Sequence, residues 1–220
     1  MKGIFITGTD TGIGKTYFTI ACIKALQQAG KTVAAMKPIA SGAEMIDGAL
    51  RNEDALQMQQ TLDHPVDYEL INPYCFIPPV SPHIAAAEAG VEIKLDVIKQ
   101  RYAELVKDAD YVIVEGVGGW LAPLSEQLQV SDLARALQLP IVMVVGIRLG
   151  CLNHAMLTAE AIRQSGLSLA GWVANCLEPE LEGLDKQIEY LSRHLQMAPL
   201  ARLGWQTSTI SASNLPGVFT

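Results

Sequence analysis

The run Gly8-Thr9-Asp10-Thr11-Gly12-Ile13-Gly14-Lys15-Thr16 contains the residues of this chain best suited to binding a phosphate group. It follows a short apolar segment and precedes a stretch of helical composition, so strand, loop and helix succeed one another. Glycines let backbone N–H groups converge on an anion, and the start of a helix adds its positive dipole end. In such a loop Lys15 reaches the β- and γ-phosphates and the Thr16 hydroxyl binds magnesium. We therefore expect a nucleoside triphosphate here.

The spacing of this loop departs by one residue from the usual pattern G-x-x-x-x-G-K-[ST]. Thr9 stands where the pattern has its first glycine, and five residues separate Gly8 from Gly14. The alternative is a surface turn rich in glycine and threonine that carries a solvated lysine. That alternative accounts poorly for an intact Gly-Lys-Thr end between a strand and a helix.

Two charged residues directly follow other apolar, strand-length segments. Lys37 follows residues 32–36, and Glu115 follows residues 111–114 and precedes a glycine-rich turn. In parallel sheets, ligands bind beyond the carboxyl ends of the strands. We expect Lys37 to leave the core and point into the ligand crevice or into solvent. Glu115 is placed to be an outer partner of a magnesium site, or else to pair with a neighbouring arginine.

Polar residues lie near three further segment ends, and those at the first two have two interpretations each. Asp54 could bind a metal or simply serve the first turn of a helix. Asn153 could cap a helix or belong to an anion site at that helix start, and His154 could be a first-turn polar residue or a base. The Asn175 amide can match the donor–acceptor edge of a purine.

The elements that must position these residues alternate between strand and helix along the chain. This alternation predicts an α/β fold, with a mostly parallel central sheet flanked by helices on both faces and a P-loop NTPase arrangement. Residues 72–82, rich in proline, are expected to form an extended loop. The expected strands are 4–7, 32–36, 111–114, 141–146 and 169–174, and the expected helices are 17–29, 52–61, 83–89, 95–107, 130–137, 153–164 and 184–195.

Composition narrows the class of protein. A chain of 220 residues suits one domain, here 1–220, with a single large core. The formal net charge of -7, without a lysine- or arginine-rich block, argues against a nucleic-acid partner. Four widely spaced cysteines without a C-x-x-C pair fit a reducing cytoplasm. No signal peptide and no membrane-spanning apolar run are visible, so we expect a cytoplasmic protein without a membrane partner.

Taken together, these residues resemble the dethiobiotin synthetase family. The resemblance is specific as far as about Asn175 and weakens after Cys176. Its motifs are Thr7-Gly8-Thr9-Asp10-Thr11-Gly12-Ile13-Gly14-Lys15-Thr16, Lys37-Pro38-Ile39-Ala40-Ser41-Gly42, Arg51-Asn52-Glu53-Asp54-Ala55, Asn72-Pro73-Tyr74, Ser81-Pro82-His83, Val114-Glu115-Gly116-Val117-Gly118-Gly119-Trp120, Leu149-Gly150-Cys151-Leu152-Asn153-His154-Ala155 and Ala170-Gly171-Trp172-Val173-Ala174-Asn175.

The resemblance implies an ATP-dependent ligase of biotin biosynthesis. An amine of 7,8-diaminopelargonic acid and CO2 give a carbamate, which the γ-phosphoryl group of ATP activates as a carbamic–phosphoric anhydride. The second amine then closes the ring to dethiobiotin, releasing ADP and phosphate. Both reacting groups are anions, so Lys15 and Lys37 suit the task of placing positive charge between them from opposite sides.

The resemblance also implies roles for individual residues. Catalytic roles fall to Lys37, Lys15 and Thr11, and Mg²⁺ would be bound by Thr16, Asp54 and Glu115. ATP would be bound by Gly12, Ile13, Gly14, Lys15, Thr16, Tyr17, Asp54, Glu115, Gly116, Val117, Gly118, Asn175, Cys176, Gly204 and Trp205. The diamine substrate would be bound by Thr11, Lys37, Ser41, Ser81, Val117, Gly118, Gly150, Cys151, Leu152, Asn153 and Tyr190.

The family arrangement further implies a homodimer. The substrate carboxylate would bind at the helix start near Gly150, supplied with a tyrosine by the second subunit, and Tyr190 is the candidate tyrosine across an insertion at 178–185. Three departures from the family pattern stand out. Gly12 lacks the acidic side chain found in some members, Gly204 replaces a common proline before Trp205, and the tail 206–220 has no clear match.

Two other classes of P-loop protein compete with this interpretation. A cobyrinic-acid-type amidotransferase would need a second, glutamine-hydrolysing domain, for which 220 residues leave no room. A ParA/MinD-like nucleotide switch would carry an additional lysine early in the phosphate loop, where this chain has Asp10-Thr11-Gly12, and commonly a basic surface or an amphipathic tail.

Overall fold

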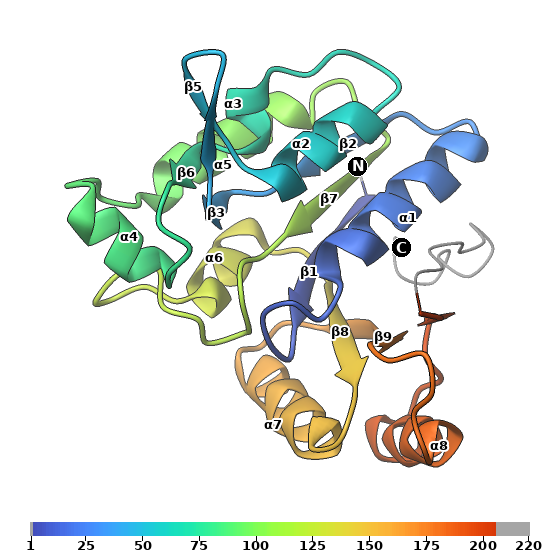
Figure 1. Ribbon diagram of the computed structural model, residues 1–220. Coiled ribbons are helices and arrows are strands. Elements are labelled where there is room, and N and C mark those ends of the chain that lie inside the picture. Colours follow the sequence, from blue (N-terminus) through green and yellow to red (C-terminus); the bar gives the residue numbers. More distant parts are fainter. Residues whose placement is uncertain (1, 206–220) are drawn as a thin grey trace.

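The computed structural model describes residues 2–205, and Figure 1 shows helices packed around a twisted sheet. The strands are β1 (Lys2–Gly8), β2 (Val33–Met36), β3 (Ile39–Ser41), β4 (Glu44–Ile46), β5 (Ala49–Arg51), β6 (Tyr74–Phe76), β7 (Tyr111–Glu115), β8 (Ile141–Ile147), β9 (Leu169–Cys176) and β10 (Ala201–Leu203). The helices are α1 (Lys15–Gln28), α2 (Glu53–Thr61), α3 (Tyr68–Ile71), α4 (Pro82–Glu88), α5 (Leu95–Leu105), α6 (Val130–Leu137), α7 (Cys151–Gln164) and α8 (Leu184–Leu195).

The central sheet has six strands in the order β10-β9-β8-β1-β7-β2, and every neighbouring pair is parallel. β1 lies in the interior of this order, between β7 and β8. The loop after β1 is therefore flanked by the loops after β7 and β8. The prediction of a mostly parallel sheet covered by helices is confirmed.

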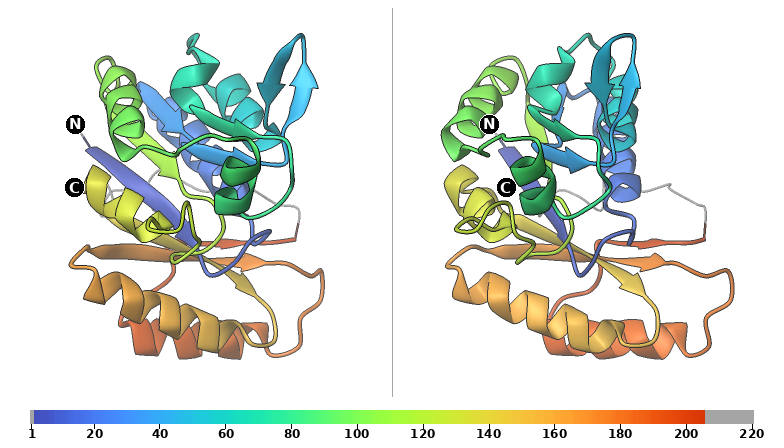
Figure 2. Two further views of the ribbon diagram at one scale, coloured as in Figure 1. Left: turned by 90° about the vertical axis from the view of Figure 1, so that its left-hand side faces the viewer. Right: turned by 60° about the vertical axis from the view of Figure 1, so that its left-hand side comes forward.

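Side-chain alternation along the strands divides the core into two layers. Ile4 and Ile6 of β1 pack with residues of α1 and α2 on one face, whereas Phe5 packs with residues of α5 to α8 on the other. Because helices cover both faces of the sheet, the central strands are continuously apolar and do not alternate between apolar and polar residues. The two views in Figure 2 show the helices on either side of the sheet.

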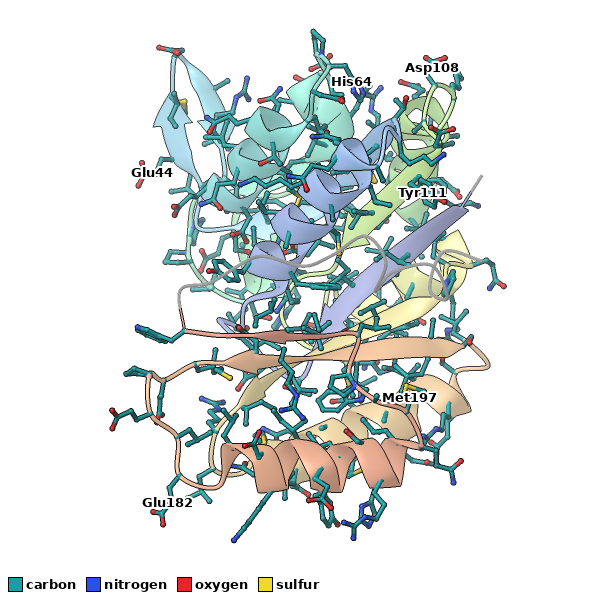
Figure 3. All side chains as sticks on the ribbon, turned by 90° about the vertical axis from the view of Figure 1, so that its right-hand side faces the viewer. Glu44, His64, Asp108, Tyr111, Glu182 and Met197 are labelled. Carbon is teal, nitrogen blue, oxygen red and sulfur yellow. The ribbon has the colours of Figure 1, made fainter. Side chains whose placement is uncertain are left out.

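The carboxyl ends of the six parallel strands lie at one edge of the sheet. In Figure 3, Tyr111 at the start of β7 and Asp108 before it lie on the right, at the amino-terminal edge. Glu182, in the segment after β9, lies on the left, as does Glu44 of β4. The loops that carry the candidate site residues follow the strands on this left-hand side.

Several short elements were not predicted. The expected extended loop 72–82 contains β6, which pairs in parallel with β3, and β4 pairs with β5 as a hairpin. β10 adds an edge strand beside β9. Each of these strands spans three residues, which is too short for a recognisable hydrophobic period. Within residues 2–205, no helix combines the length and apolarity needed to cross a membrane.

Candidate active site

The phosphate loop runs from the end of β1 to the first residue of α1. Gly14 caps that helix with φ 89°, and a Cβ atom placed on Gly14 would lie 2.1 Å from the Asn175 Nδ2 atom. Glycine is therefore required here by both the backbone and the space. The Asn175 side chain donates a 2.8 Å hydrogen bond from Nδ2 to the carbonyl oxygen of Ile13. Asn175, at the end of β9, thus holds the loop in place.

Lys15 is folded back over the phosphate loop. Its Nζ donates a 2.8 Å hydrogen bond to the carbonyl oxygen of Asp10, and the residue is buried. Burial lowers the pKa of Lys15 to about 8, and the positive charge of Lys37 acts in the same direction against the nearby carboxylates. An arriving phosphate would reverse this shift, because negative charge favours the protonated amine.

Asp10 connects the phosphate loop to the turn after β8. One of its carboxylate oxygens accepts a 2.7 Å hydrogen bond from the backbone N–H of Thr11, and the other lies 2.6 Å from Arg148 Nη2. The pair is about half-exposed, so its contribution to stability is small. It nevertheless fixes the position of the phosphate loop relative to the turn after β8.

Glu115 forms the centre of a buried charged cluster at the end of β7. Its Oε1 lies 2.5 Å from Lys37 Nζ and accepts a 2.8 Å hydrogen bond from the Thr16 hydroxyl. Lys37 Nζ also lies 2.9 Å from Asp54 Oδ2, so one ammonium group joins two carboxylates. The alternative of an arginine partner for Glu115 is wrong, because the partner is Lys37.

The expectation that Lys37 would leave the core is only half correct. Its side chain lines the cavity described below, but the residue is 4% exposed. Burial alone would lower the pKa of Lys37, yet the charges of Glu115 and Asp54 outweigh it and raise this pKa. For Asp54, burial acts to raise the pKa, but the charge and hydrogen bond of Lys37 outweigh it, so the pKa is lowered. Both groups are held in their charged forms.

Thr19 belongs to the same cluster and was not foreseen. This fully buried residue of α1 places its hydroxyl oxygen 2.7 Å from Glu115 Oε2 and 3.0 Å from the carbonyl oxygen of Lys15. A hydroxyl has one proton, so the two acceptors share it. The sequence did contain an indication of this role, because Thr19 follows Thr16 by one helical turn and so lies on the same face of α1.

A cavity of about 650 Å³ collects many of the predicted residues at this edge of the sheet. The predicted residues that line it are Thr11, Gly12, Gly14, Lys15, Thr16, Lys37, Ser41, Asp54, Ser81, Glu115, Val117 and Gly118. The lining residues that were not predicted are Ala40, Asn52, Pro79, Val80, Pro82, Gly119 and Ala122. Charged groups thus occupy the part beside the phosphate loop, and prolines and Val80 add an apolar wall.

Ser41 carries an unused hydrogen-bonding group beside the cavity. Its buried hydroxyl oxygen has no partner within the described part of the chain, although Ser41 lines the cavity. Buried polar groups are normally paired, so this hydroxyl is suited to a ligand. Asn52 fixes the Ser41 backbone by donating a 3.3 Å hydrogen bond from Nδ2 to the Ser41 carbonyl oxygen.

The residues predicted to surround adenine lie outside this cavity. Asn175 pairs in register with Leu203 of β10, so Cys176, Gly204 and Trp205 are gathered at the ends of two neighbouring strands. Trp205 is 46% exposed, and the phosphate loop is adjacent through Ile13. Three further predicted residues do not line the cavity either. Ile13 is buried in the core, Tyr17 lies half-buried on α1, and a Cβ atom on buried Gly116 would meet the ring of Phe5.

The helix that was expected to begin at residue 153 begins two residues earlier. Gly150, with φ 91°, is the N-cap of α7, so the interpretation of Asn153 as the cap is wrong. A positive φ suits glycine and lets the chain turn sharply out of β8. The half-buried Leu152 and the exposed His154 also belong to the first turn, and His154 donates its backbone N–H to the Gly150 carbonyl oxygen.

Other residues predicted for the substrate carboxylate lie away from the cavity within one chain. The Cys151 thiol is buried and lies 3.2 Å from Gln187 Oε1 of α8. Tyr190 is 40% exposed on α8, with its ring stacked on His194 at 3.9 Å between centroids. The tail 206–220 lies outside the described residues.

The donor set at the Glu115 cluster bears on metal binding. Within residues 2–205, no group of three or more His, Cys, Asp or Glu side chains could hold a metal ion. The cluster instead offers two carboxylates and the Thr16 hydroxyl, all oxygen donors. Mg²⁺ is commonly held by one or two carboxylates together with substrate phosphates and water. The residues therefore fit a magnesium ion that arrives with a nucleotide.

Comparisons with known proteins identify close relatives. A family model described as an AAA domain matches residues 2–213. The ATP-dependent dethiobiotin synthetase BioD of Xanthomonas euvesicatoria is 46% identical over 214 residues, covering 97% of this chain and 96% of that protein. The protein of the same name from Aromatoleum aromaticum is 46% identical over 219 residues, covering 97% of each. These matches extend beyond Asn175, where the resemblance seen in the motifs weakens.

Solved structures of low sequence identity share the fold. A ParA family ATPase from Chlorobium tepidum superimposes with a TM-score of 0.57 at 14% identity, covering 99% of this chain and 89% of that one. MinD from Aquifex aeolicus gives 0.56 at 15% identity, covering 94% and 83%. At such identities the likeness concerns the P-loop NTPase fold alone.

Proposed function

The chain belongs to the ATP-dependent dethiobiotin synthetase family, and we propose that its cavity brings the γ-phosphoryl group of ATP against a carbamate. The carbamate forms from CO2 and one amine of 7,8-diaminopelargonic acid. Its oxygen attacks the γ-phosphorus and displaces ADP, giving a carbamic–phosphoric anhydride. The second amine attacks the carbamoyl carbon, releases phosphate and closes the cyclic urea. The protein is thus an ATP-dependent cyclo-ligase of biotin biosynthesis.

The observation that carries this proposal is the presence of two buried lysines at one cavity beside a phosphate loop. Lys15 and Lys37 both line it, and both are less than a tenth exposed. Two anions must approach each other before they react, and preorganised positive charge in a site shielded from water stabilises that approach. Lys15, with the loop N–H groups, suits the phosphates, while Lys37 faces the reacting gap.

Lys37 must change partners when the reactants bind. Its ammonium group joins Glu115 and Asp54, the two carboxylates proposed to bind Mg²⁺ with Thr16. When bound, the metal ion would neutralise charge on the phosphates. Lys37 would then be displaced from the carboxylates towards the carbamate and the γ-phosphate. The lysine therefore keeps the two carboxylates paired until the nucleotide arrives.

The remaining lining residues suit the diamine. The unpaired Ser41 hydroxyl, Thr11 and Ser81 offer polar groups for the amines and the carbamate. Val117 and Gly118 approach from the loop after β7, where a Cβ atom on Gly118 would lie 3.6 Å from the Thr11 hydroxyl. The apolar wall of Pro79, Val80 and Pro82 suits an alkyl chain.

The adenine base would lie at the ends of β9 and β10. Asn175 uses one amide N–H for the Ile13 carbonyl oxygen, which leaves its other N–H and its carbonyl oxygen for a base. Backbone groups of Cys176, Gly204 and Trp205 are close enough in the sheet register to complete that site. ATP would then extend along the phosphate loop into the cavity.

A second subunit would complete the substrate site. Residues Gly150 to Asn153 at the start of α7, with Tyr190, would bind the substrate carboxylate from the partner chain. Leu149 is 96% exposed and Leu121 is 57% exposed, in the two loops that flank the phosphate loop. A partner chain docked at this edge would cover both leucines. The four free cysteines fit a cytoplasmic location.

The experiment that tests this function measures products. Purified protein, ATP, Mg²⁺ and bicarbonate should yield dethiobiotin and ADP only when the diamine is present. ATP hydrolysis that is indifferent to the diamine but stimulated by DNA or lipid vesicles would favour a ParA/MinD-like switch instead. Mass spectrometry of the cyclic urea separates the two results.

A further inference from the structure

A second hollow, of about 360 Å³, is lined by residues of β5, α3 and α5, which lie in the upper part of Figure 1. It shares no lining residue with the cavity of the phosphate loop. We call it the arginine hollow, and its lining residues are Ala49, Leu50, Arg51, Tyr68, Glu69, Asn72, Pro73, Cys75, Val97 and Arg101. None of the steps proposed above uses it.

The arginine hollow carries a guanidinium group that is held rigidly but not neutralised. The Arg51 guanidinium carbon lies 4.2 Å from the centroid of the Tyr68 ring, and Arg51 Nη1 donates to the Leu50 carbonyl oxygen. Among residues 2–205, no carboxylate lies within ion-pair distance of Arg51. Since a guanidinium has five N–H donors, most of those of Arg51 remain available.

The other charges of the arginine hollow leave it positive. Arg101 of α5 contributes a second guanidinium, paired loosely with Glu104 at 3.6 Å, and Glu69 contributes one carboxylate at the rim. Two guanidinium groups and one carboxylate line the hollow, and Glu104, the partner of Arg101, lies outside its lining. Arg51, which has no carboxylate partner among residues 2–205, therefore makes an anion the favoured occupant. Leu50, Pro73 and Val97 give the hollow an apolar part as well.

We propose that the arginine hollow is a regulatory site for a small organic carboxylate. The carboxylate group would accept hydrogen bonds from Arg51 and Arg101, and its short apolar body would lie on Leu50 and Val97. The volume suits a ligand of this size. Inorganic phosphate has the charge but no apolar part, so it should bind more weakly.

Hydrogen bonds connect the arginine hollow to the catalytic residues. The Tyr68 hydroxyl accepts a 2.7 Å hydrogen bond from the Asn52 backbone N–H and donates at 2.9 Å to Asn72 Oδ1. Asn72 Nδ2 in turn donates at 2.6 Å to the Lys37 carbonyl oxygen, and Asn52 Nδ2 donates to the Ser41 carbonyl oxygen. Burial raises the pKa of Tyr68, so its hydroxyl stays neutral and keeps its proton for this relay.

A ligand that contacts Arg51 and the Tyr68 ring therefore acts on the backbone supporting Lys37 and Ser41. Binding free energies at two coupled sites change reciprocally. If the function proposed above holds, an occupied hollow should change the affinity for the diamine or the turnover number. The binding step itself does not depend on that function.

The test is calorimetric titration of the full chain with hexanoate, benzoate and phosphate at constant ionic strength, with and without a non-hydrolysable ATP analogue. We expect hexanoate or benzoate to bind with a dissociation constant of about 1 mM or tighter. The analogue should not displace them. Arg51→Gln and Arg101→Gln should each weaken binding by at least about tenfold. Arg193→Gln, which alters an exposed i,i+4 pair on α8, is the matched control and should not change it.

The Arg101→Gln variant should fold even if Arg51→Gln does not. Arg101 lies on the partly exposed surface of α5, and its replacement leaves the Arg51–Tyr68 contact intact. Steady-state turnover with and without hexanoate then tests regulation. The proposal is overturned by any of four results: no carboxylate binding, displacement by the nucleotide analogue, unchanged binding in both arginine variants, or binding that leaves turnover and diamine affinity unaltered. Failure to make dethiobiotin, with carboxylate binding intact, would count against the proposed reaction alone.

Discussion

The hydroxyl of Thr19 lies 2.7 Å from the Oε2 atom of Glu115, inside the core, and Thr19 does not line the cavity. Thr16 and Lys37 occupy the other oxygen of the same carboxylate. Both oxygens of Glu115 are thus held before any ligand binds, which fixes the plane of the carboxylate. Such preorganisation lets a site stabilise charge without rearranging during the reaction.

Replacing Thr19 tests whether its hydrogen bond to Glu115 contributes to stability and to metal-dependent nucleotide binding. Thr19→Val keeps the shape but leaves Glu115 Oε2 without its donor, so the free energy of unfolding should fall by about 1–3 kcal/mol. Thr19→Ser restores the hydroxyl and should recover most of that loss. Urea unfolding measures the effect, and calorimetry of nucleotide binding with and without Mg²⁺ should show a weaker metal dependence only for the valine variant. Equal behaviour of the two variants would show that the hydroxyl does not position Glu115.

Lys37→Gln should separate catalysis from nucleotide binding. Lys37 is proposed to act on charge that develops during phosphoryl transfer, so turnover should fall by at least about 100-fold. The dissociation constant for ATP should change far less, because the phosphate loop and Lys15 remain. Lys24→Gln, on the exposed side of α1, is the control. Retained turnover in the Lys37 variant would remove this residue from the mechanism.

The depressed pKa of Lys15, about 8, predicts proton uptake on nucleotide binding. Below pH 8 the amine is already charged in the free protein, whereas above it the triphosphate must first recruit a proton. ATP affinity should therefore fall as pH rises above about 8, by up to roughly tenfold per pH unit. Titrations in buffers of different ionisation enthalpy measure the protons taken up. Lys15→Met should abolish the uptake, and a pH-independent affinity between pH 7 and 9 would contradict the assignment.

The close approach of Asn175 to Gly14 predicts that Gly12 and Gly14 differ in how well they tolerate replacement by alanine. Gly14→Ala would place a methyl group 2.1 Å from Asn175 Nδ2, so the loop must shift and ATP affinity should drop by at least about tenfold. Gly12→Ala is the matched control. Its φ is also positive, at 70°, but among residues 2–205 no atom beyond its two chain neighbours lies within 4 Å of the added carbon.

Gly12→Ala should accordingly lower the free energy of unfolding by only about 1 kcal/mol, through backbone strain. Combining Gly14→Ala with Asn175→Ala should recover part of the lost ATP affinity, since it removes the atom that the new methyl group meets. No recovery in the double variant would show that the positive φ of Gly14, rather than the contact with Asn175, is decisive.

The proposed dimer can be tested by dilution. If the start of α7 and Tyr190 come from the partner chain, a monomer should lose affinity for the diamine while keeping its affinity for ATP. Leu149→Glu places a charge on an exposed leucine and should shift the protein to monomers in analytical ultracentrifugation. Leu157→Glu, also exposed but on the middle of α7, is a comparison. Unchanged diamine affinity in a demonstrated monomer would refute the shared site.

Local patterns were enough to predict much of this protein. The apolar runs of β1, β7 and β8 and the Gly-Lys-Thr end of the loop indicated a parallel sheet and a phosphate site, because a strand buried on both faces leaves its mark within a few residues. Lys37 and Glu115 were found by their place directly after strands. Both residues line one cavity because the strands that precede them end at the same edge of the sheet.

What the sequence did not reveal depends on contacts between distant segments. Thr19 meets Glu115 across 96 positions, and Asn175 meets Ile13 across 162. Such contacts require the strand order and register, which no local pattern specifies. The same reason explains why three-residue strands such as β3 and β6 were missed: their stability comes from each other and not from their own residues. The sequence by itself determined which residues could bind a nucleotide, whereas the tertiary structure decided which side chains hold them in place.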